Sequence, residues 1–201
     1  MRFVVIGAGG FSKEIADMLN DLGHESVAFF DDRIGPGVHS TTGLPVVAVP
    51  ADLPAHDAMC AAVGDAGARA RLTSRFASTP MPALVHPRAC VSANATLGEG
   101  TLVMQNVVVS ASAEVGAFCI LNVGAYVAHD CVVGAFTHLA AGVNLGGGSS
   151  VGESCLCGTG SVLLPGVHVG SNVTLGAGAV VHRDLPAGVT AAGVPARVIR
   201  S

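Results

Sequence analysis

An imidazole and a carboxylate stand side by side at His129-Asp130. Imidazole has a reference pKa of about 6.5, so its neutral form can accept a proton near neutral pH. A neighbouring carboxylate can fix the tautomer of the ring and stabilise the imidazolium that forms. The pair could therefore serve as a general base with its orienting group. The alternative is a surface histidine beside a turn aspartate, because Asp suits turns.

A glycine-rich turn, GAGGFS at residues 7–12, offers a second kind of chemistry. Backbone N–H groups of such a turn can approach a phosphate at the start of a helix. Asp31 and Asp32 come after the next strand, where an acidic side chain would hold a ribose hydroxyl. Ser12 stands where the fingerprint G-x-G-x-x-G has its third glycine. A plain tight turn and a solvated strand end are the alternative interpretations.

The segments around this turn predict a small α/β domain of Rossmann-like type. Apolar runs and helical spacing alternate along it, which is typical of βαβ units. The expected strands are 2–6, 26–30, 44–49 and 57–63, and the expected helices are 13–22 and 66–76. The domain is short for a full dinucleotide site, which usually needs two such halves. We therefore expect residues 1–82 to bind a mononucleotide portion of a ligand.

Beyond this domain the sequence repeats with a period of six residues. Stepping by six from Val85 to Val181 meets Val or Leu at sixteen of seventeen positions, the exception being Cys157. The positions four residues later are nearly all small. This period is typical of a stacked β-helix, in which three hexads close a triangular coil of 18 residues. We expect residues 83–201 to form this β-helix, with the aliphatic side chains inside it.

The phase of the repeat places the candidate chemical groups. His129 is the third residue of its hexad, a position that points outward at a corner. Gly147, in the triple glycine 146–148, lies one coil away, where the backbone has no side chain and an N–H could donate to a ligand oxygen. A tight corner is the alternative for this glycine. Four cysteines fall on inward positions as small core residues: Cys119, Cys131, Cys155 and Cys157.

Composition argues against several classes of function. The net charge is −4, and the single lysine, Lys13, belongs to no basic cluster. The chain therefore lacks the basic patch that nucleic acid or an anionic membrane requires. No apolar run reaches about 18 residues, and the start is too short for a signal peptide core. We expect a cytoplasmic protein with no membrane partner and with buried free thiols at its six cysteines.

Several motifs together resemble the hexapeptide-repeat acyltransferases, whose fold is a left-handed parallel β-helix. The closing AGVPARVI at 192–199 is similar to the G-V-P-A-[KR] tail of that superfamily. The N-terminal βαβ unit, Gly64-Asp65 and Val85-His86-Pro87 narrow the resemblance to bacterial nucleotide-amino-sugar N-acetyltransferases and sialic acid O-acetyltransferases. The resemblance covers essentially the whole chain. It implies a homotrimer that uses acetyl-CoA and no metal, with active sites between neighbouring β-helices.

The resemblance also implies roles for individual residues. His129 would be the catalytic base with Asp130, and His138 and Gly147 would lie beside the thioester and the acetyl group. The pantetheine and adenine portions of acetyl-CoA would be bordered by Ala177, Gly178 and Arg197. The sugar nucleotide would be held by Gly9, Gly10, Phe11, Asp31, Asp32 and Asn122. Phe11 is a departure, because some family members have a histidine there that helps to hold the nucleotide.

Together these features predict an acetyl-CoA-dependent N-acetyltransferase for a nucleotide-linked 4-amino-deoxy sugar, with no covalent acyl-enzyme. O-acetylation of a sialic acid or a related sugar hydroxyl is the alternative, since the same His-Asp pair would serve. A zinc hydratase on a similar β-helix would need three converging histidines. His129 and His138 are half a coil apart, and no third histidine is placed with them. A non-catalytic scaffold is the remaining alternative.

Overall fold

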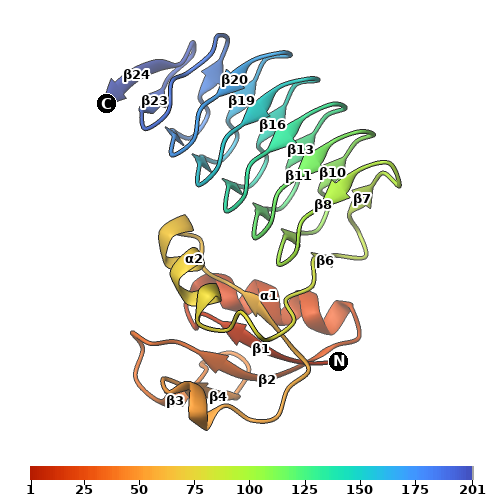
Figure 1. Ribbon diagram of the computed structural model, residues 1–201, viewed down its shortest axis with the longest axis vertical. Coiled ribbons are helices and arrows are strands. Elements are labelled where there is room, and N and C mark those ends of the chain that lie inside the picture. Colours follow the sequence, from red (N-terminus) through yellow and green to blue (C-terminus); the bar gives the residue numbers. More distant parts are fainter. Residues whose placement is uncertain (201) are drawn as a thin grey trace. The chain divides into compact units, whose positions relative to one another are not determined.

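The computed structural model describes residues 1–200 and contains two compact units, Met1–Pro82 and a second unit that begins at Ala83 (Figure 1). The first unit is an α/β fold and the second is a parallel β-helix, so the predicted fold class is confirmed. Within residues 1–200, no helix is both long enough and apolar enough to cross a membrane.

A five-stranded sheet forms the centre of the N-terminal unit, in the order β3-β4-β2-β1-β5. Its strands are β1 (Arg2–Ile6), β2 (Glu25–Phe30), β3 (Gly37–Val38), β4 (Pro45–Val47) and β5 (Ala58–Ala61). All neighbours run parallel except β3, which pairs antiparallel with β4 at the edge. Residues 3–6 of β1 are wholly buried, as expected for a parallel strand covered on both faces.

Helix α1 (Gly10–Asp21) begins three residues earlier than the sequence predicted, so the start at residue 13 is wrong. Gly9 is its N-cap in an extended conformation, and the glycine turn therefore passes directly into the helix. The other helices are α2 (Ala66–Ser74) and the short 3-10 helix η1 (Pro50–Asp52). The predicted ranges 44–49, 57–63 and 66–76 were too long, because hydrogen bonding rather than apolar character decides where an element ends.

The β-helix unit is a prism whose walls are three sheets. The six-stranded wall contains β7 (Cys90–Val91), β10 (Val108–Val109), β13 (Tyr126–Val127), β16 (Asn144–Leu145), β19 (Val162–Leu163) and β22 (Val180–Val181). The five-stranded wall contains β8 (Thr96–Leu97), β11 (Glu114–Val115), β14 (Val132–Val133), β17 (Ser150–Val151) and β20 (His168–Val169). The eight-stranded wall contains β6 (Leu84–Val85), β9 (Leu102–Val103), β12 (Ile120–Leu121), β15 (His138–Leu139), β18 (Leu156–Cys157), β21 (Thr174–Leu175), β23 (Thr190–Ala192) and β24 (Arg197–Arg200).

Each full coil contains 18 residues, as the hexad period predicted. Val109 pairs with Val127, and Val127 pairs with Leu145. The aliphatic residues therefore stack from coil to coil, and they are buried after the first coil, where they are half-exposed. The tail leaves this pattern: β23 joins the eight-stranded wall and β24 folds back antiparallel on it. These two strands were not predicted from the sequence.

The small inward residues at one corner donate hydrogen bonds to the next coil. Each of four such residues, one coil apart, donates to a glycine carbonyl over 2.7–3.1 Å: Thr101, Cys119, Thr137 and Cys155. These bonds connect each coil to the corner of the next coil through its backbone carbonyl groups. At these four corners the small inward side chain is also a hydrogen-bond donor.

All six cysteines are free thiols, and five of them are buried. Burial raises the pKa of Cys60 to about 12, and it also raises the pKa of Cys155 and Cys157. These thiols stay protonated and are poor nucleophiles, in agreement with their interpretation as core residues. Cys90 is exposed, so the prediction that it would be buried is wrong. It occupies the first position of β7, which points outward from the coil.

Candidate active site

His129 follows β13 at a corner of the β-helix, and its ring points outward as the hexad phase predicted. The side chain of His129 is 67% exposed and that of Asp130 is 64% exposed. Nδ1 of His129 lies 2.7 Å from Oδ2 of Asp130. An ionised carboxylate can only accept a hydrogen bond, so the ring donates from Nδ1 and Nε2 is left as a proton acceptor. The pair has the arrangement that a general base requires.

The backbone of two neighbouring coils holds this pair in place. Asp130 has a φ of +60°, a left-handed conformation that Asp tolerates better than most residues. Its N–H donates to the carbonyl of Ala111 in the preceding coil, and the carbonyl of His129 accepts from the N–H of Gly148 in the following coil. The corner that carries the imidazole is therefore fixed on both sides.

Gly147 lies beside the ring of His129, one coil further along, as predicted. A Cβ at position 147 would lie 2.7 Å from both Nε2 and Cε1 of that ring. A side chain could therefore occupy this space only by moving the imidazole. Within residues 1–200, the N–H of Gly147 donates to no backbone carbonyl. It is free to donate to a carbonyl oxygen placed beside the ring.

The other residues predicted to bind acetyl-CoA lie elsewhere on the β-helix. His138 is half-buried on β15 in the eight-stranded wall, whereas His129 follows a strand of the six-stranded wall. The fold does not bring these two histidines together within one chain. Ala177 and Gly178 are exposed in the turn between β21 and β22, and Arg197 is exposed at the start of β24.

The glycine turn borders a pocket of about 280 Å³ in the N-terminal unit. The fold brings together in its lining five residues that the sequence analysis selected: Gly9, Gly10, Phe11, Asp31 and Asp32. The remaining predicted substrate residue, Asn122, belongs to the β-helix unit. It lies in the turn after β12, where its Oδ1 accepts from the N–H of Val123 at 2.7 Å.

Asp31 uses both of its carboxylate oxygens to shape this pocket. Its Oδ2 accepts from the N–H of Ala8 in the glycine turn at 2.9 Å. Its Oδ1 accepts from the N–H groups of Arg33 and Ile34, at 2.9 and 3.1 Å. The side chain thus connects the end of β2 to the glycine turn. Contact between Asp31 and a ribose hydroxyl stays a prediction.

Asp32 is paired with Arg71 of helix α2 and with Arg75, the C-cap of that helix. Its Oδ2 accepts from Nη1 of Arg71 at 2.9 Å and from Nη1 of Arg75 at 2.8 Å. The hydrogen bond from Arg71 is the main reason that the pKa of Asp32 lies below its ordinary value, with the charge of Arg75 adding to the effect. Arg75 also lies over the ring of Phe30, 5.1 Å from its centroid.

Sequence reasoning missed two arginines that line the pocket, Arg33 and Arg71. The spacing of Arg71 and Arg75 on a predicted helix was a signal, because residues four apart share a helix face. Their common partner, Asp32, is 39 residues from Arg71, and a sequence pattern does not reveal such a pairing. The lining thus holds two guanidinium groups, of Arg33 and Arg71, beside the carboxylates of Asp31 and Asp32, at the N-terminus of α1.

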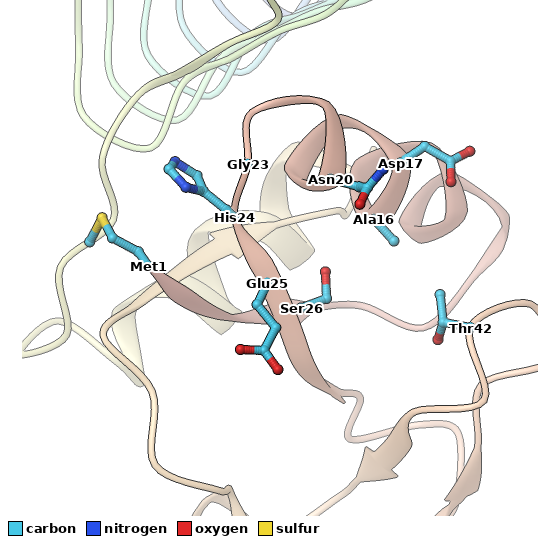
Figure 2. Close-up of a pocket in the computed structure, with 9 residues that line it drawn as sticks. All are labelled: Met1, Ala16, Asp17, Asn20, Gly23, His24, Glu25, Ser26 and Thr42. Atoms are coloured by element: carbon cyan, nitrogen blue, oxygen red, sulfur yellow. The ribbon is translucent and has the colours of Figure 1, made fainter.

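A larger hollow of about 710 Å³ lies elsewhere on the N-terminal unit (Figure 2). Its lining includes the carboxylates of Asp17 and Glu25, and the imidazole of His24, which stacks on Phe3 with ring centroids 5.2 Å apart. Figure 2 shows the two carboxylates pointing in different directions rather than converging. None of the site residues predicted from the sequence is among its described lining residues, so this hollow is separate from the candidate site.

Both units match known protein families. Residues 2–76 match the family model of the PglD N-terminal domain, and residues 148–183 match that of the bacterial transferase hexapeptide, six repeats. A comparison with curated proteins finds no match.

Solved structures are similar to the chain over nearly its whole length. The acetyltransferase domain of PglB from Neisseria gonorrhoeae FA1090, in complex with acetyl coenzyme A, is 37% identical with a TM-score of 0.90, and the match covers 98% of each chain. A mutant of perosamine N-acetyltransferase from Caulobacter crescentus, in complex with CoA and GDP-perosamine, is 36% identical with a TM-score of 0.93, covering 100% of this chain and 98% of that chain. WeeI from Acinetobacter baumannii AYE is 27% identical with a TM-score of 0.91, covering 99% of this chain and 100% of that chain.

A left-handed β-helix of hexapeptide repeats with an outward His-Asp pair, preceded by an α/β unit, defines an acyltransferase of the hexapeptide-repeat class. Within that class, the chain belongs to the family of bacterial sugar N-acetyltransferases that carry a PglD-type N-terminal domain. It is an acetyl-CoA-dependent acetyltransferase, and the prediction of this activity and of acetyl-CoA as co-substrate is confirmed.

Proposed function

We propose that the protein transfers the acetyl group of acetyl-CoA to the amino group of a nucleotide-linked 4-amino-deoxy sugar, with His129 as general base. The observation that carries this proposal is the 2.7 Å contact between Nδ1 of His129 and Oδ2 of Asp130, which leaves Nε2 as the acceptor next to Gly147. A base of this kind contributes a rate factor of about 10²–10⁴ in enzymes.

The chemical step follows from this geometry. The amine nitrogen attacks the thioester carbon, Nε2 of His129 takes the amine proton, and the carbon–sulfur bond breaks. CoA leaves as a thiolate, and the acetyl group is joined to the sugar by an amide bond. Asp130 stabilises the imidazolium through its hydrogen bond to Nδ1. The scheme needs no thiol of the protein, and five of the six are buried core groups.

The surroundings of Gly147 fit an acetyl group. The absence of a side chain leaves room for the acetyl methyl and carbonyl against the backbone. The unpartnered N–H of Gly147 can donate to the thioester oxygen, where negative charge develops during attack. Binding of the remaining coenzyme would extend along the β-helix to Ala177, Gly178 and Arg197, which are all exposed.

The two histidines of the site belong to different walls, which suggests an active site shared between copies. In one chain, His129 lies at the corner after β13, whereas His138 lies on β15 in the eight-stranded wall, so the two side chains do not converge. A homotrimer would place His129 of one copy near His138 of its neighbour, with the thioester between them. Sedimentation at micromolar concentration measures this state directly, and a monomer with full activity would contradict the shared site.

The pocket beside the glycine turn suits the nucleoside diphosphate portion of the proposed substrate. The N-terminus of α1 and the guanidinium groups of Arg33 and Arg71 can bind phosphate oxygens, while the carboxylates of Asp31 and Asp32 in the same lining can accept from ribose hydroxyls. Phe11 offers a ring against which a nucleotide base can pack. In agreement with this, the perosamine N-acetyltransferase structure holds GDP-perosamine. A hydroxyl acceptor is the second candidate, but that relative is an N-acetyltransferase, which favours an amine.

The test is a panel of nucleotide-linked amino sugars and free sialic acids, each incubated with acetyl-CoA while free thiol is measured. We expect thiol release with the amino sugars and a product one acetyl group heavier. In the same assay His129→Ala should lower kcat by about 10²–10⁴-fold. His182→Ala, which removes another exposed histidine of the β-helix, should leave kcat unchanged. Turnover of sialic acids alone, or an unchanged rate for His129→Ala, would contradict the proposal.

A further inference from the structure

Ser12 occupies the place where a G-x-G-x-x-G turn has its third glycine, and the fold explains this departure. The side chain of Ser12 is completely buried in the first turn of α1. Its hydroxyl donates to the carbonyl of Gly9, at 2.5 Å, and its N–H donates to the same carbonyl at 3.1 Å. Ser12 therefore holds the peptide that joins Gly9 to Gly10, at the edge of the nucleotide pocket.

His39 supports Ser12 from the loop between β3 and β4. The residue is 3% exposed, and its Nε2 lies 3.1 Å from the Ser12 hydroxyl. The ring stacks on Phe29 of β2, with centroids 3.9 Å apart and planes inclined by 14°. On its other side, Nδ1 lies 3.0 Å from the Thr42 hydroxyl and 3.4 Å from the Thr42 N–H. Each nitrogen of this buried imidazole thus has a polar partner.

The partners of His39 define its protonation state. The Ser12 hydroxyl has one proton and gives it to the carbonyl of Gly9, so Nε2 of His39 must carry a proton and donate to Ser12. A backbone N–H can only donate, so Nδ1 of His39 must be unprotonated to accept from the Thr42 N–H. Both ends of the ring require the same neutral tautomer. The hydrogen bonds run in one direction, from Thr42 through His39 and Ser12 to Gly9.

We propose that His39 is a positioning residue for the nucleotide sugar: its neutral, Nε2-protonated ring orients Ser12 and thereby holds the Gly9–Gly10 peptide in the form that the pocket needs. The proposal rests on the proposed function, because it assumes that the pocket beside this turn binds the nucleotide. His39 is not among the residues that line that pocket. It acts on the ligand only through Ser12 and the turn.

Protonation of His39 would break this chain of hydrogen bonds. A second ring proton on Nδ1 would face the Thr42 N–H, so that two donors would oppose each other. Burial lowers the pKa of His39, and the positive charge of Lys13 on α1 lowers it further. Phe29 from β2, Ser12 from α1 and Thr42 from the ring's own loop are uncharged neighbours. The neutral ring is thus the stable form at neutral pH, and the turn should loosen only in acid.

The experiment compares His39→Leu and His39→Gln with the parent enzyme, using the nucleotide amino sugar that the parent acetylates. Gln can donate to Ser12 and accept from Thr42 without titrating, whereas Leu can do neither. At neutral pH we expect His39→Leu to raise the KM of the nucleotide sugar by about tenfold or more, with the KM of acetyl-CoA unchanged. We expect His39→Gln to stay within about threefold of the parent.

A pH series separates positioning from mere folding. The KM of the nucleotide sugar should rise in acid for the parent and rise less for His39→Gln, because only the parent has a titrating group at this position. An unchanged KM for His39→Leu, or the same rise in acid for His39→Gln and parent, would overturn the proposal. If His39→Leu does not fold, Ser12→Ala tests the same series of hydrogen bonds by removing the hydroxyl between His39 and Gly9. It should raise the same KM, and an unchanged value there would equally overturn the proposal.

The proposed function can fail separately from this inference. If the parent does not acetylate any nucleotide sugar while it still binds acetyl-CoA, the substrate assignment is wrong. If the parent acetylates a nucleotide sugar and the variants at positions 12 and 39 share its KM, the positioning role alone is wrong.

Discussion

The imidazole of His129 and the backbone of Gly147 lie in adjacent coils, so close that a Cβ at position 147 would be 2.7 Å from Nε2. Both residues occupy the third position of their hexads, 18 residues apart. The β-helix thus places a proton acceptor directly against a stretch of backbone that has no side chain.

Gly147→Ala should lower kcat by about tenfold or more, because the new methyl group must displace the imidazole of His129. The φ of Gly147 lies outside the left-handed region, so the substitution adds no backbone strain there. In a His129→Ala background the same change should have little further effect on kcat, since the ring it displaces is gone. Additive effects of the two substitutions would show that Gly147 acts independently of His129.

Asp130→Asn should lower kcat by about ten- to hundredfold, the effect of losing one charge-assisted hydrogen bond. Asn tolerates the left-handed backbone at this position, so the corner should keep its shape. The amide can donate to Nδ1, which would favour the tautomer in which Nε2 carries the proton and cannot accept one. Steady-state rates at saturating acetyl-CoA measure the change, and parent-like turnover would remove Asp130 from the mechanism.

Arg71→Gln should raise the KM of the nucleotide sugar by about ten- to hundredfold, the effect of losing a hydrogen bond between two charged groups. Arg75→Gln is the matched control, because Arg75 contacts the same oxygen of Asp32 but does not line the pocket. Neither change should alter the KM of acetyl-CoA. Equal increases for the two variants would mean that the arginines act by anchoring Asp32 and not by binding the ligand.

Gly134→Ala should destabilise the β-helix without touching the site. A Cβ at this corner would lie 2.5 Å from the backbone nitrogen of Glu153 in the next coil, and backbone at that distance must move. We expect a loss of at least about 1–3 kcal/mol in the free energy of unfolding, seen as a melting temperature several degrees lower. Gly35→Ala, where a Cβ would meet open space, should leave the melting temperature nearly unchanged.

The β-helix was predictable because its pattern is local and strictly periodic. A side chain at every sixth residue must face the interior, so the sequence determined which residues stack, that His129 points outward and that Gly147 lies one coil away. The same regularity accounts for the burial of Cys119 and Cys155. The start of α1 and the lengths of β4, β5 and α2 were less well predicted, since hydrogen bonds from other strands and turns decide where such elements end.

The nucleotide pocket shows what the tertiary structure alone decided. The sequence by itself indicated the glycine turn and the acidic pair, yet it did not show that Asp32 would be held by Arg71, 39 residues away. Nor did it show that His39 would reach Ser12 across 27 residues. Contacts in a repeat recur at a fixed interval and can be counted along the chain. Contacts between irregular loops have no interval, and they exist only once packing of the sheet and helices has brought the loops together.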